Sequence, residues 1–274
     1  MAKQTASSSP TVSSLIASLS SSLVYSDPGN VETNRRLWNA YSEDWNPDKP
    51  WVQTMAKHVS MESSLTFVGD EWSTSEDLLE VLDDYVFPYL KADHSVVAEI
   101  GSGGGRVSSK VVGTARLLHC FDISSGMLGH CREKLSGHSN VDFHLLSSSV
   151  FEEKYHGCFD MIIAFDVYVH VDLHTQFAAF QQIRKLLKRD GLAFISTANV
   201  LSPLGWERFS KQSKFTVGGF YFTTPDAVLR LLHEAGLRVV RRSDEEIKSK
   251  PSKNTYYLRD LLLIVERDDS LERK

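Results

Sequence analysis

The chain has 274 residues, of which 42% are hydrophobic, and it carries a formal net charge of -5 at pH 7. This length and apolar content support one full hydrophobic core, whereas the longest apolar runs are far shorter than the roughly 18 residues of a membrane-spanning helix. The acidic balance lacks the basic footprint of nucleic-acid-binding proteins. We therefore expect neither a nucleic acid nor a membrane as a partner.

The cysteines are few and poorly spaced for structural chemistry. Cys120, Cys131 and Cys158 are an odd number, and no two form a C-x-x-C pair. A disulfide framework or a cysteine-based zinc site is therefore disfavoured, and a reducing compartment, the cytoplasm, is expected.

Residues 1–28 form the first predicted region. They are rich in serine and contain no acidic residue before Asp27, a composition that predicts a disordered or weakly helical tail. Organelle transit peptides are also serine-rich and poor in acid, but they are usually arginine-rich, and Lys3 is the only base here. A cytoplasmic location is favoured over organelle targeting.

Residues 29–92 are predicted to form an N-terminal helical lid or cap. They concentrate large aromatic side chains, among them Trp38, Tyr41 and Trp45. Two interpretations remain open: a helix that packs on the domain through ordinary hydrophobic burial, or a lid over a ligand site. Further on, residues 73–76 (STSE) have the pattern of a capping box that starts another helix.

A glycine-rich turn follows the first predicted strand. Residues 96–100 form an apolar run, then come Gly101, Gly103 and Gly105, and Asp122 ends the next apolar run. Glycines ahead of a helix let a ligand approach the backbone, and an acid at the end of the second strand can accept hydrogen bonds from ribose hydroxyls. The sequence therefore predicts a nucleoside-bearing cofactor across these two strands.

Residues 99–105 (EIGSGGG) resemble the first motif of the class I S-adenosylmethionine-dependent methyltransferases. The resemblance covers residues 68–267, and its motifs follow the family's order: 121–124 with 127–128, 140–148, 159–167, 186–196, 224–239, and two closing strands at 237–242 and 256–266. It implies an α/β, Rossmann-like fold over residues 93–270, with a seven-stranded, mostly parallel sheet, helices on both faces and an antiparallel last strand. It also implies S-adenosylmethionine as cofactor and S-adenosylhomocysteine as product.

The family's cofactor contacts map onto many residues of this chain. The implied set is Tyr41, Trp72, Glu99, Gly101, Ser102, Gly103, Gly105, Arg106, Asp122, Ile123, Met127, Ser147, Ser148, Phe165 and Asp166. Two positions depart from the family pattern. Ser147 stands where an acid often reads the adenine amine, and Val169 stands where metal-dependent relatives carry a glutamate, which argues against a metal in catalysis.

An aromatic insertion at residues 199–222 interrupts the alternation of strands and helices. It follows the fifth predicted strand, at the edge where open α/β sheets bind ligands. We interpret it as the second wall of an acceptor pocket, and the alternative is a hydrophobic flap that touches no substrate. The predicted pocket residues are Trp38, Trp45, Trp206, Phe220 and Tyr221.

Methyl transfer from a sulfonium is an in-line displacement, so the protein must place the acceptor and exclude water. His170, which follows the fourth strand beside Tyr168, is the candidate base, because an imidazole titrates near neutral pH. The alternative is that His170 only hydrogen-bonds backbone or shapes the pocket.

The sequence predicts a small-molecule methyltransferase, with the acceptor atom (O, N, S or C) and the oligomeric state left open. Three alternatives remain: a protein or RNA methyltransferase of the same fold, a silent binding module that retains the cofactor fold, and a nucleotide-linked oxidoreductase.

Overall fold

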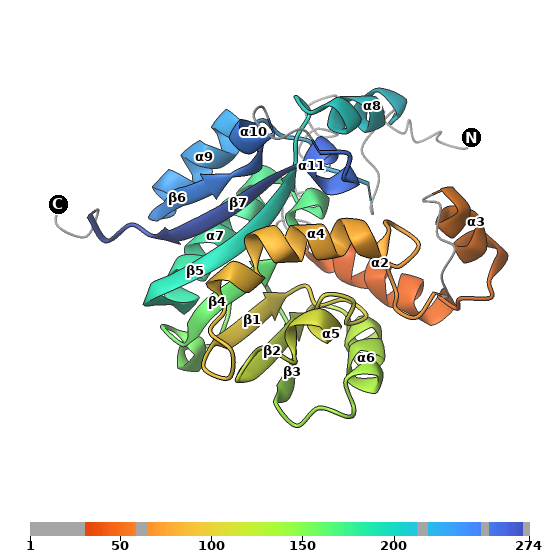
Figure 1. The fold of residues 1–274 in the computed structure, drawn as a ribbon, viewed down its shortest axis with the longest axis horizontal. Helices are drawn as coiled ribbons and strands as arrows, with labels where there is room; N and C mark the ends of the chain where they lie inside the picture. The colour runs from red at the N-terminus through yellow and green to blue at the C-terminus, as the bar shows by residue number, and fades with distance from the viewer. Residues whose placement is uncertain (1–30, 59–64, 213–218, 248–251, 271–274) are drawn as a thin grey trace, which may run out of the picture.

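The computed structural model describes residues 31–58, 65–212, 219–247 and 252–270, so the predicted tail lies outside them. Seven strands form one sheet in the order β3-β2-β1-β4-β5-β7-β6 (Figure 1). Strand β7 runs antiparallel to both of its neighbours, whereas β1 to β5 pair in parallel. The strands are β1 (Val96–Ile100), β2 (Leu117–Asp122), β3 (Val141–Leu145), β4 (Phe159–Ala164), β5 (Leu187–Ala198), β6 (Leu237–Arg242) and β7 (Asp260–Arg267). The predicted fold class is confirmed.

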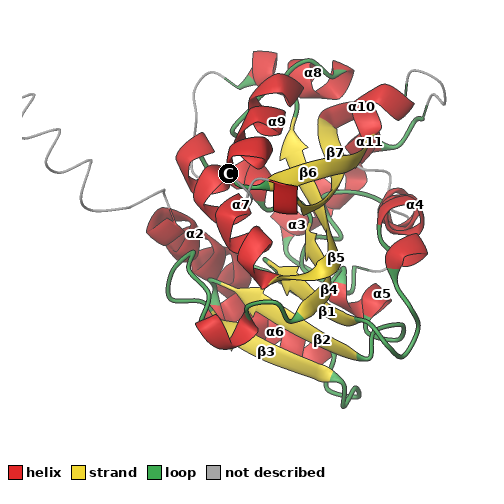
Figure 2. Ribbon diagram, turned by 90° about the vertical axis from the view of Figure 1, so that its left-hand side faces the viewer, coloured by secondary structure: helices red, strands yellow, loops and turns green. Residues whose placement is uncertain are grey.

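Helices cover both faces of the sheet, with a hydrophobic core on each side (Figure 2). One face carries α4 (Ser75–Tyr85), α5 (Ser108–Val111) and α6 (Ser125–Lys134), and the other carries α7 (Leu173–Leu186) and α9 (Pro225–Glu234). All five positions of β1 are buried, because a parallel strand is covered from both sides. The glycine turn after β1 thus starts from a rigid strand.

Two N-terminal helices, α2 (Val31–Asp44) and α3 (Pro50–His58), lie in the region that was expected to be helical. The chain turns between them, and Pro50 takes the first helical position, which suits proline because that N–H needs no partner. Helix α2 lies against α6, where the Ser124 hydroxyl donates to the Asn39 side-chain oxygen over 2.7 Å. Among the described helices, none is long and apolar enough to cross a membrane.

The start of the last strand differs from the prediction. Residues 256–266 were expected as a strand, but α11 (Thr255–Arg259) comes first and β7 begins only at Asp260. The Asn254 side chain accepts from the Tyr256 N–H and caps α11, which turns the chain into a helix. The Tyr256 hydroxyl is 2.6 Å from the Ser73 hydroxyl, so α11 also holds the segment that precedes α4.

The remaining elements are short. Thr74 caps α4 by accepting from the Asp77 N–H at 3.0 Å, one residue after the N-cap that the capping-box pattern predicts. The Ser73 hydroxyl instead contacts Tyr256 and Arg106. Helix α4, assigned above to the cap, packs on the sheet, and the division near residue 92 stays a prediction. The other elements are α8 (Pro203–Lys211), α10 (Ser243–Glu246) and the 3-10 helices η2 (Phe87–Tyr89), η3 (Glu153–Tyr155) and η4 (Tyr168–His170).

Candidate functional site

The glycine turn leaves β1 in a conformation that side chains rarely allow. Gly101 and Gly103 have φ of +71° and +54°, the left-handed region that favours glycine. A Cβ at Gly101 would collide with the Val167 side chain, whereas a Cβ at Gly103 would meet nothing within 4 Å. Gly103 therefore presents bare backbone to open space.

Asp122, at the carboxyl end of β2, fixes this turn to the start of α6. Its carboxylate accepts from the Gly103 N–H and from the Ser124 N–H, each over 2.8 Å. Burial raises the pKa of Asp122, while these backbone donors oppose the shift. A carboxylate has about four acceptor positions, so it retains capacity for a ligand hydroxyl.

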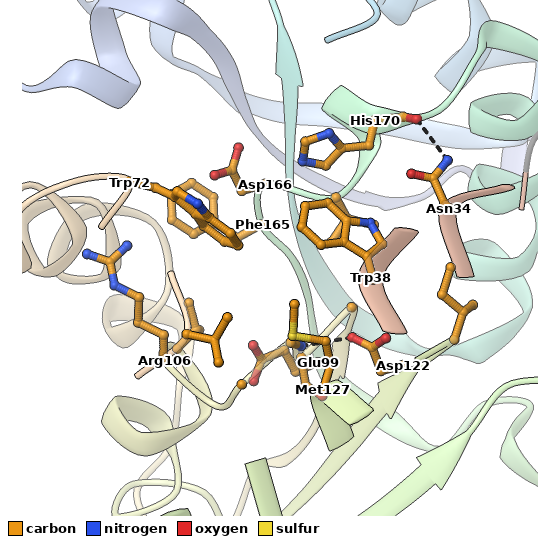
Figure 3. A pocket seen from close by; sticks show the side chains of 18 of the residues that line it. Asn34, Trp38, Trp72, Glu99, Arg106, Asp122, Met127, Phe165, Asp166 and His170 are labelled. Atoms are coloured by element: carbon orange, nitrogen blue, oxygen red, sulfur yellow. Dashed lines mark hydrogen bonds between the residues drawn. The ribbon is translucent and has the colours of Figure 1, made fainter. Parts of the chain in front are cut away.

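A cavity of about 140 Å³ lies over the turn (Figure 3). Its lining comes from the turn, from the ends of β1, β2 and β4, and from the covering segments: Asn34, Trp38, Val68, Trp72, Leu78, Glu99, Gly101, Ser102, Gly103, Gly104, Arg106, Val107, Asp122, Ile123, Met127, Phe165, Asp166, Val167, His170, Val171 and Tyr256. Most of these side chains are apolar, with a few polar groups among them, as is typical of small-molecule sites.

Helix α2 and residues 65–74 cover the cavity and are held together by Glu71. This buried carboxylate accepts from the Tyr41 hydroxyl at 2.5 Å, the Trp45 Nε1–H at 3.1 Å and the Gly69 N–H at 3.0 Å. Trp38 and Trp72 meet over the cavity, with ring centroids 5.9 Å apart. The cover is thus a hydrogen-bonded aromatic layer.

Arg35 ties α2 to the loops that follow β2 and β3. Its guanidinium donates to the carbonyls of Leu146 at 2.9 Å and Ser147 at 2.7 Å, and more weakly to that of Ile123 at 3.4 Å. The cover and the loop that follows β3 are therefore connected by one side chain.

His170 stands where the chain leaves β4, and in the view of Figure 3 the Trp38 ring lies between His170 and Asp122. Its ring lies 5.0 Å from the Trp38 ring and 5.3 Å from the Phe220 ring, both edge-on. Its Nδ1 is 3.2 Å from the Gly219 carbonyl oxygen. Since a carbonyl only accepts, the proton is assigned to Nδ1 and the basic lone pair to Nε2.

Burial lowers the pKa of His170 from its ordinary value of 6.5. The ring is therefore neutral at pH 7 and able to accept a proton.

Asp166, beside His170, is held in an unusual conformation. Its φ is +58°, a left-handed value uncommon for residues other than glycine. Its N–H donates to the Ser196 hydroxyl, and its carboxylate accepts from buried Arg259, each over 2.7 Å. These contacts hold the exit of β4 at the edge of the cavity.

The sequence and the fold of this chain were compared with those of known proteins. Residues 97–191 match the model of a family described as a methyltransferase domain. The fold matches magnesium protoporphyrin IX methyltransferase from Synechocystis PCC 6803 crystallised with S-adenosylhomocysteine, with a TM-score of 0.58 and 17% identity over 85% of this chain and 99% of that one. The same enzyme crystallised with S-adenosylmethionine gives a TM-score of 0.54 and 15% identity over 85% and 97%.

Over residues 97–191 the chain thus resembles the S-adenosylmethionine-dependent methyltransferases, and its fold is the Rossmann-like fold of the class I members. A ubiquinone biosynthesis O-methyltransferase from Glaesserella parasuis serovar 5 (strain SH0165) is 31% identical over 110 residues. That alignment covers 38% of this chain and 45% of the relative, less than half of its length.

The structures of the neighbouring methyltransferase hold S-adenosylmethionine or its product, and the residues around this cavity suit that cofactor. Gly103 leaves open the space a Cβ would fill, Asp122 offers ribose an acceptor at the end of β2, and Met127 and Phe165 give apolar surface. These features meet in one cavity: an acceptor for ribose hydroxyls, open space beside the backbone, and apolar surface for the carbon atoms of the cofactor.

Many of the predicted site residues line this cavity. They are Trp38, Trp72, Glu99, Gly101, Ser102, Gly103, Arg106, Asp122, Ile123, Met127, Phe165, Asp166 and His170. Glu99 is buried and accepts from the Ser108 hydroxyl at 2.5 Å, and burial raises its pKa. The Arg106 guanidinium is occupied by protein groups, including Asp70 at 2.9 Å, so its cofactor role stays a prediction.

Other predicted residues lie outside the cavity lining. They are Tyr41, Trp45, Gly105, Ser147, Ser148, Tyr168, Trp206, Phe220 and Tyr221. Gly105 faces Cys131 in the α6 packing, Trp206 is 58% exposed, and Phe220 touches His170 from outside the cavity. Their assigned roles stay predictions.

The structure also adds lining residues that sequence reasoning missed. Asn34 donates to the His170 carbonyl at 3.2 Å, and Tyr256 arrives from α11 and packs on Phe165 with ring centroids 4.6 Å apart. Neither belongs to a motif. Asn34 lies in the region that the sequence predicts as a helical lid, whereas Tyr256 falls in a predicted strand and no local pattern pointed to the cavity.

Proposed function

We propose that the chain transfers the methyl group of S-adenosylmethionine to a hydroxyl oxygen of a small, largely apolar molecule, by in-line displacement without a metal ion. The observation that carries this proposal is the placement of a neutral His170 in the same cavity as the glycine turn and Asp122. The name of the 31%-identical relative, an O-methyltransferase, supports oxygen as the acceptor atom.

In the bound state, S-adenosylmethionine supplies an activated methyl group on a sulfonium. The protein must position the cofactor and the acceptor and enclose them. Asp122 would hold the ribose, the Gly103 backbone would leave room for the cofactor, and Met127 and Phe165 would pack on its apolar parts. These contacts fix the direction from which the acceptor approaches, which lowers the entropic part of the barrier.

His170 acts as the proton acceptor. A hydroxyl becomes a better nucleophile as its proton leaves, and the Nε2 lone pair of a neutral imidazole takes that proton. The Gly219 carbonyl holds Nδ1 protonated and keeps Nε2 in the basic form. The proton ends on the His170 ring and is lost to water after transfer.

The aromatic cover favours a small acceptor. Trp38 and Trp72 lie over the cavity, and the Glu71 hydrogen bonds keep that cover closed. Flat aromatic faces suit an apolar ring or chain, and an enclosed site excludes water from the reaction.

The test is methyl transfer with tritium-labelled S-adenosylmethionine and fractionated cell extract. We expect label in the small-molecule fraction, in a product resistant to mild alkali if an ether has formed. Label recovered only in protein or RNA would contradict the small-molecule acceptor. Label released as methanol by alkali would show a carboxyl acceptor instead of a hydroxyl.

A further inference from the structure

We propose that His119, Asp142 and His144 form a binding site for a divalent transition-metal ion of the Zn²⁺ class, outside the cofactor cavity. His119 lies on β2 and the other two residues lie on β3, the strand at the edge of the sheet (Figure 1). In the register of these strands, His119 is opposite Asp142 and Phe121 is opposite His144. Since side chains alternate between faces, all three ligands share one face.

The ligand atoms are already close together. His119 Nδ1 and His144 Nε2 are 2.9 Å apart, and His119 Nδ1 is 3.8 Å from an Asp142 carboxylate oxygen. One ligand atom from each residue lies within 4.8 Å of the others. Two imidazole nitrogens that each bind Zn²⁺ at about 2.0–2.1 Å in a tetrahedral site are about 3.3 Å apart, so binding needs only a small separation of the two rings.

The second nitrogen of His144 is held in place as metal sites require. The Tyr155 hydroxyl, from η3, is 3.1 Å from His144 Nδ1. A partner on the outer nitrogen fixes the tautomer and the ring direction of a metal-bound histidine. Phe121 stacks on His144 with ring centroids 4.6 Å apart, and Phe159 packs edge-on against His119 at 5.4 Å. The two rings are thus oriented before any ion arrives.

The site is reachable and has suitable charge. The Asp142 side chain is 56% exposed, so an ion can enter from solvent and water can complete its coordination. Burial lowers the pKa of both histidines, and neutral imidazole is the form that binds metals. Two imidazoles and a carboxylate are ligands that suit Zn²⁺ and its first-row neighbours.

A bound ion would connect the edge strand to the body of the sheet. β3 is an edge strand that pairs only with β2 in the sheet. An ion bound by residues of both strands would add a second kind of connection between them. Binding to the folded state alone raises stability by mass action. The segment after β3 contains Ser147, so the ion would also steady the start of the adenine-edge loop.

The experiment uses the full chain, purified without a histidine tag and stripped with a chelator. Co²⁺ is titrated by its visible absorption and Zn²⁺ by calorimetry, both without S-adenosylmethionine. We expect one ion per chain and a rise in Tm on Zn²⁺ addition. His144→Gln and Asp142→Asn should weaken binding, and Tyr155→Phe should weaken it about 10–100-fold, as loss of an outer partner does. His138→Gln, at an exposed histidine, is the matched control and should bind like the wild type.

Asp142→Asn and Tyr155→Phe each change a single polar group, so these variants should still fold. Far-ultraviolet circular dichroism would show whether they do. The proposal is overturned if the wild-type chain shows no saturable Zn²⁺ binding below millimolar concentration. It is also overturned if binding survives unchanged in the folded Asp142→Asn and Tyr155→Phe variants. Neither outcome touches the proposed methyl transfer, because these residues lie outside the cavity lining.

Discussion

The floor of the cavity and its cover are built by different physical means. The floor consists of the glycine turn and Asp122, where backbone φ angles and backbone donors decide the shape. The cover consists of α2 and residues 65–74, where Glu71 and a layer of aromatic rings decide it. The floor is local in sequence and falls within the region that matches the methyltransferase family model. The cover depends on contacts between segments that are distant in the sequence. The class of cofactor can therefore be inferred from a local sequence pattern, whereas the class of acceptor cannot.

The strongest way to break the floor is Gly103→Val. The left-handed φ and the open space at Gly103 mean that the new side chain is both strained and inside the cavity. We expect loss of S-adenosylmethionine affinity of more than about 100-fold, or over about 2.7 kcal/mol, measured by calorimetry. Gly113→Val is the control, because a Cβ there also meets nothing within 4 Å but Gly113 is outside the cavity. Equal affinity in both variants would remove Gly103 from the site.

His170→Ala tests whether the residue that lies between the floor and the cover acts as the base. Loss of a positioned base typically lowers kcat by about 10²–10⁴-fold, and we expect cofactor affinity to change little. The measurement is turnover with an accepted substrate alongside a cofactor titration. An equal loss in both quantities would indicate a purely structural role for His170.

The dependence of kcat/KM on pH also tests whether His170 is the base. Burial lowers the pKa of His170 below 6.5, and the protonated ring cannot accept a proton. Activity is therefore expected to rise with pH through that lowered pKa and to be fully present at pH 7. We expect the acidic limb of kcat/KM below pH 6.5, and the His170→Ala variant should lack it. A limb that persists in the variant would belong to another group.

Asp122→Ala probes the ribose contact. We expect cofactor affinity to fall by about 1–3 kcal/mol, the range for hydrogen bonds lost at a buried acceptor. Asp83→Ala, at an exposed acid on α4, is the control. Thermal unfolding of both variants separates a binding effect from a general loss of fold. Unchanged affinity in Asp122→Ala would exclude the carboxylate from the site.

The smallest effects are expected on the cover. Trp38→Ala should raise the KM for the acceptor more than it weakens the cofactor, because Trp38 lines the cavity and touches His170. Trp206→Ala should change neither, since Trp206 is 58% exposed and outside the lining. A larger effect of Trp206→Ala on KM would place the α8 segment at the acceptor and restore the predicted second wall.

The floor was predictable because its causes are local. A buried strand, three glycines and an acid at the next strand end predicted a nucleoside site, and Gly101, Gly103 and Asp122 do line one cavity. The alternation of strands and helices also predicted a parallel sheet, and β1 to β5 pair in parallel.

The cover and the end of the chain were less predictable. Asn254 caps α11 and delays the last strand to Asp260, although the apolar run begins earlier. Tyr256 reaches the cavity because its hydroxyl meets Ser73, 183 residues away in sequence. Trp45, which was expected at the acceptor, donates its Nε1–H to Glu71, and its acceptor role stays a prediction. Such choices depend on tertiary partners that no local pattern records.

The most direct measurement is a calorimetric titration of the full chain with S-adenosylmethionine, S-adenosylhomocysteine and a nicotinamide dinucleotide. We predict saturable micromolar binding of the first two at one site, mutual competition between them, and no binding of the dinucleotide. Binding of the dinucleotide alone, or of none of the three, would contradict the assignment of the cavity.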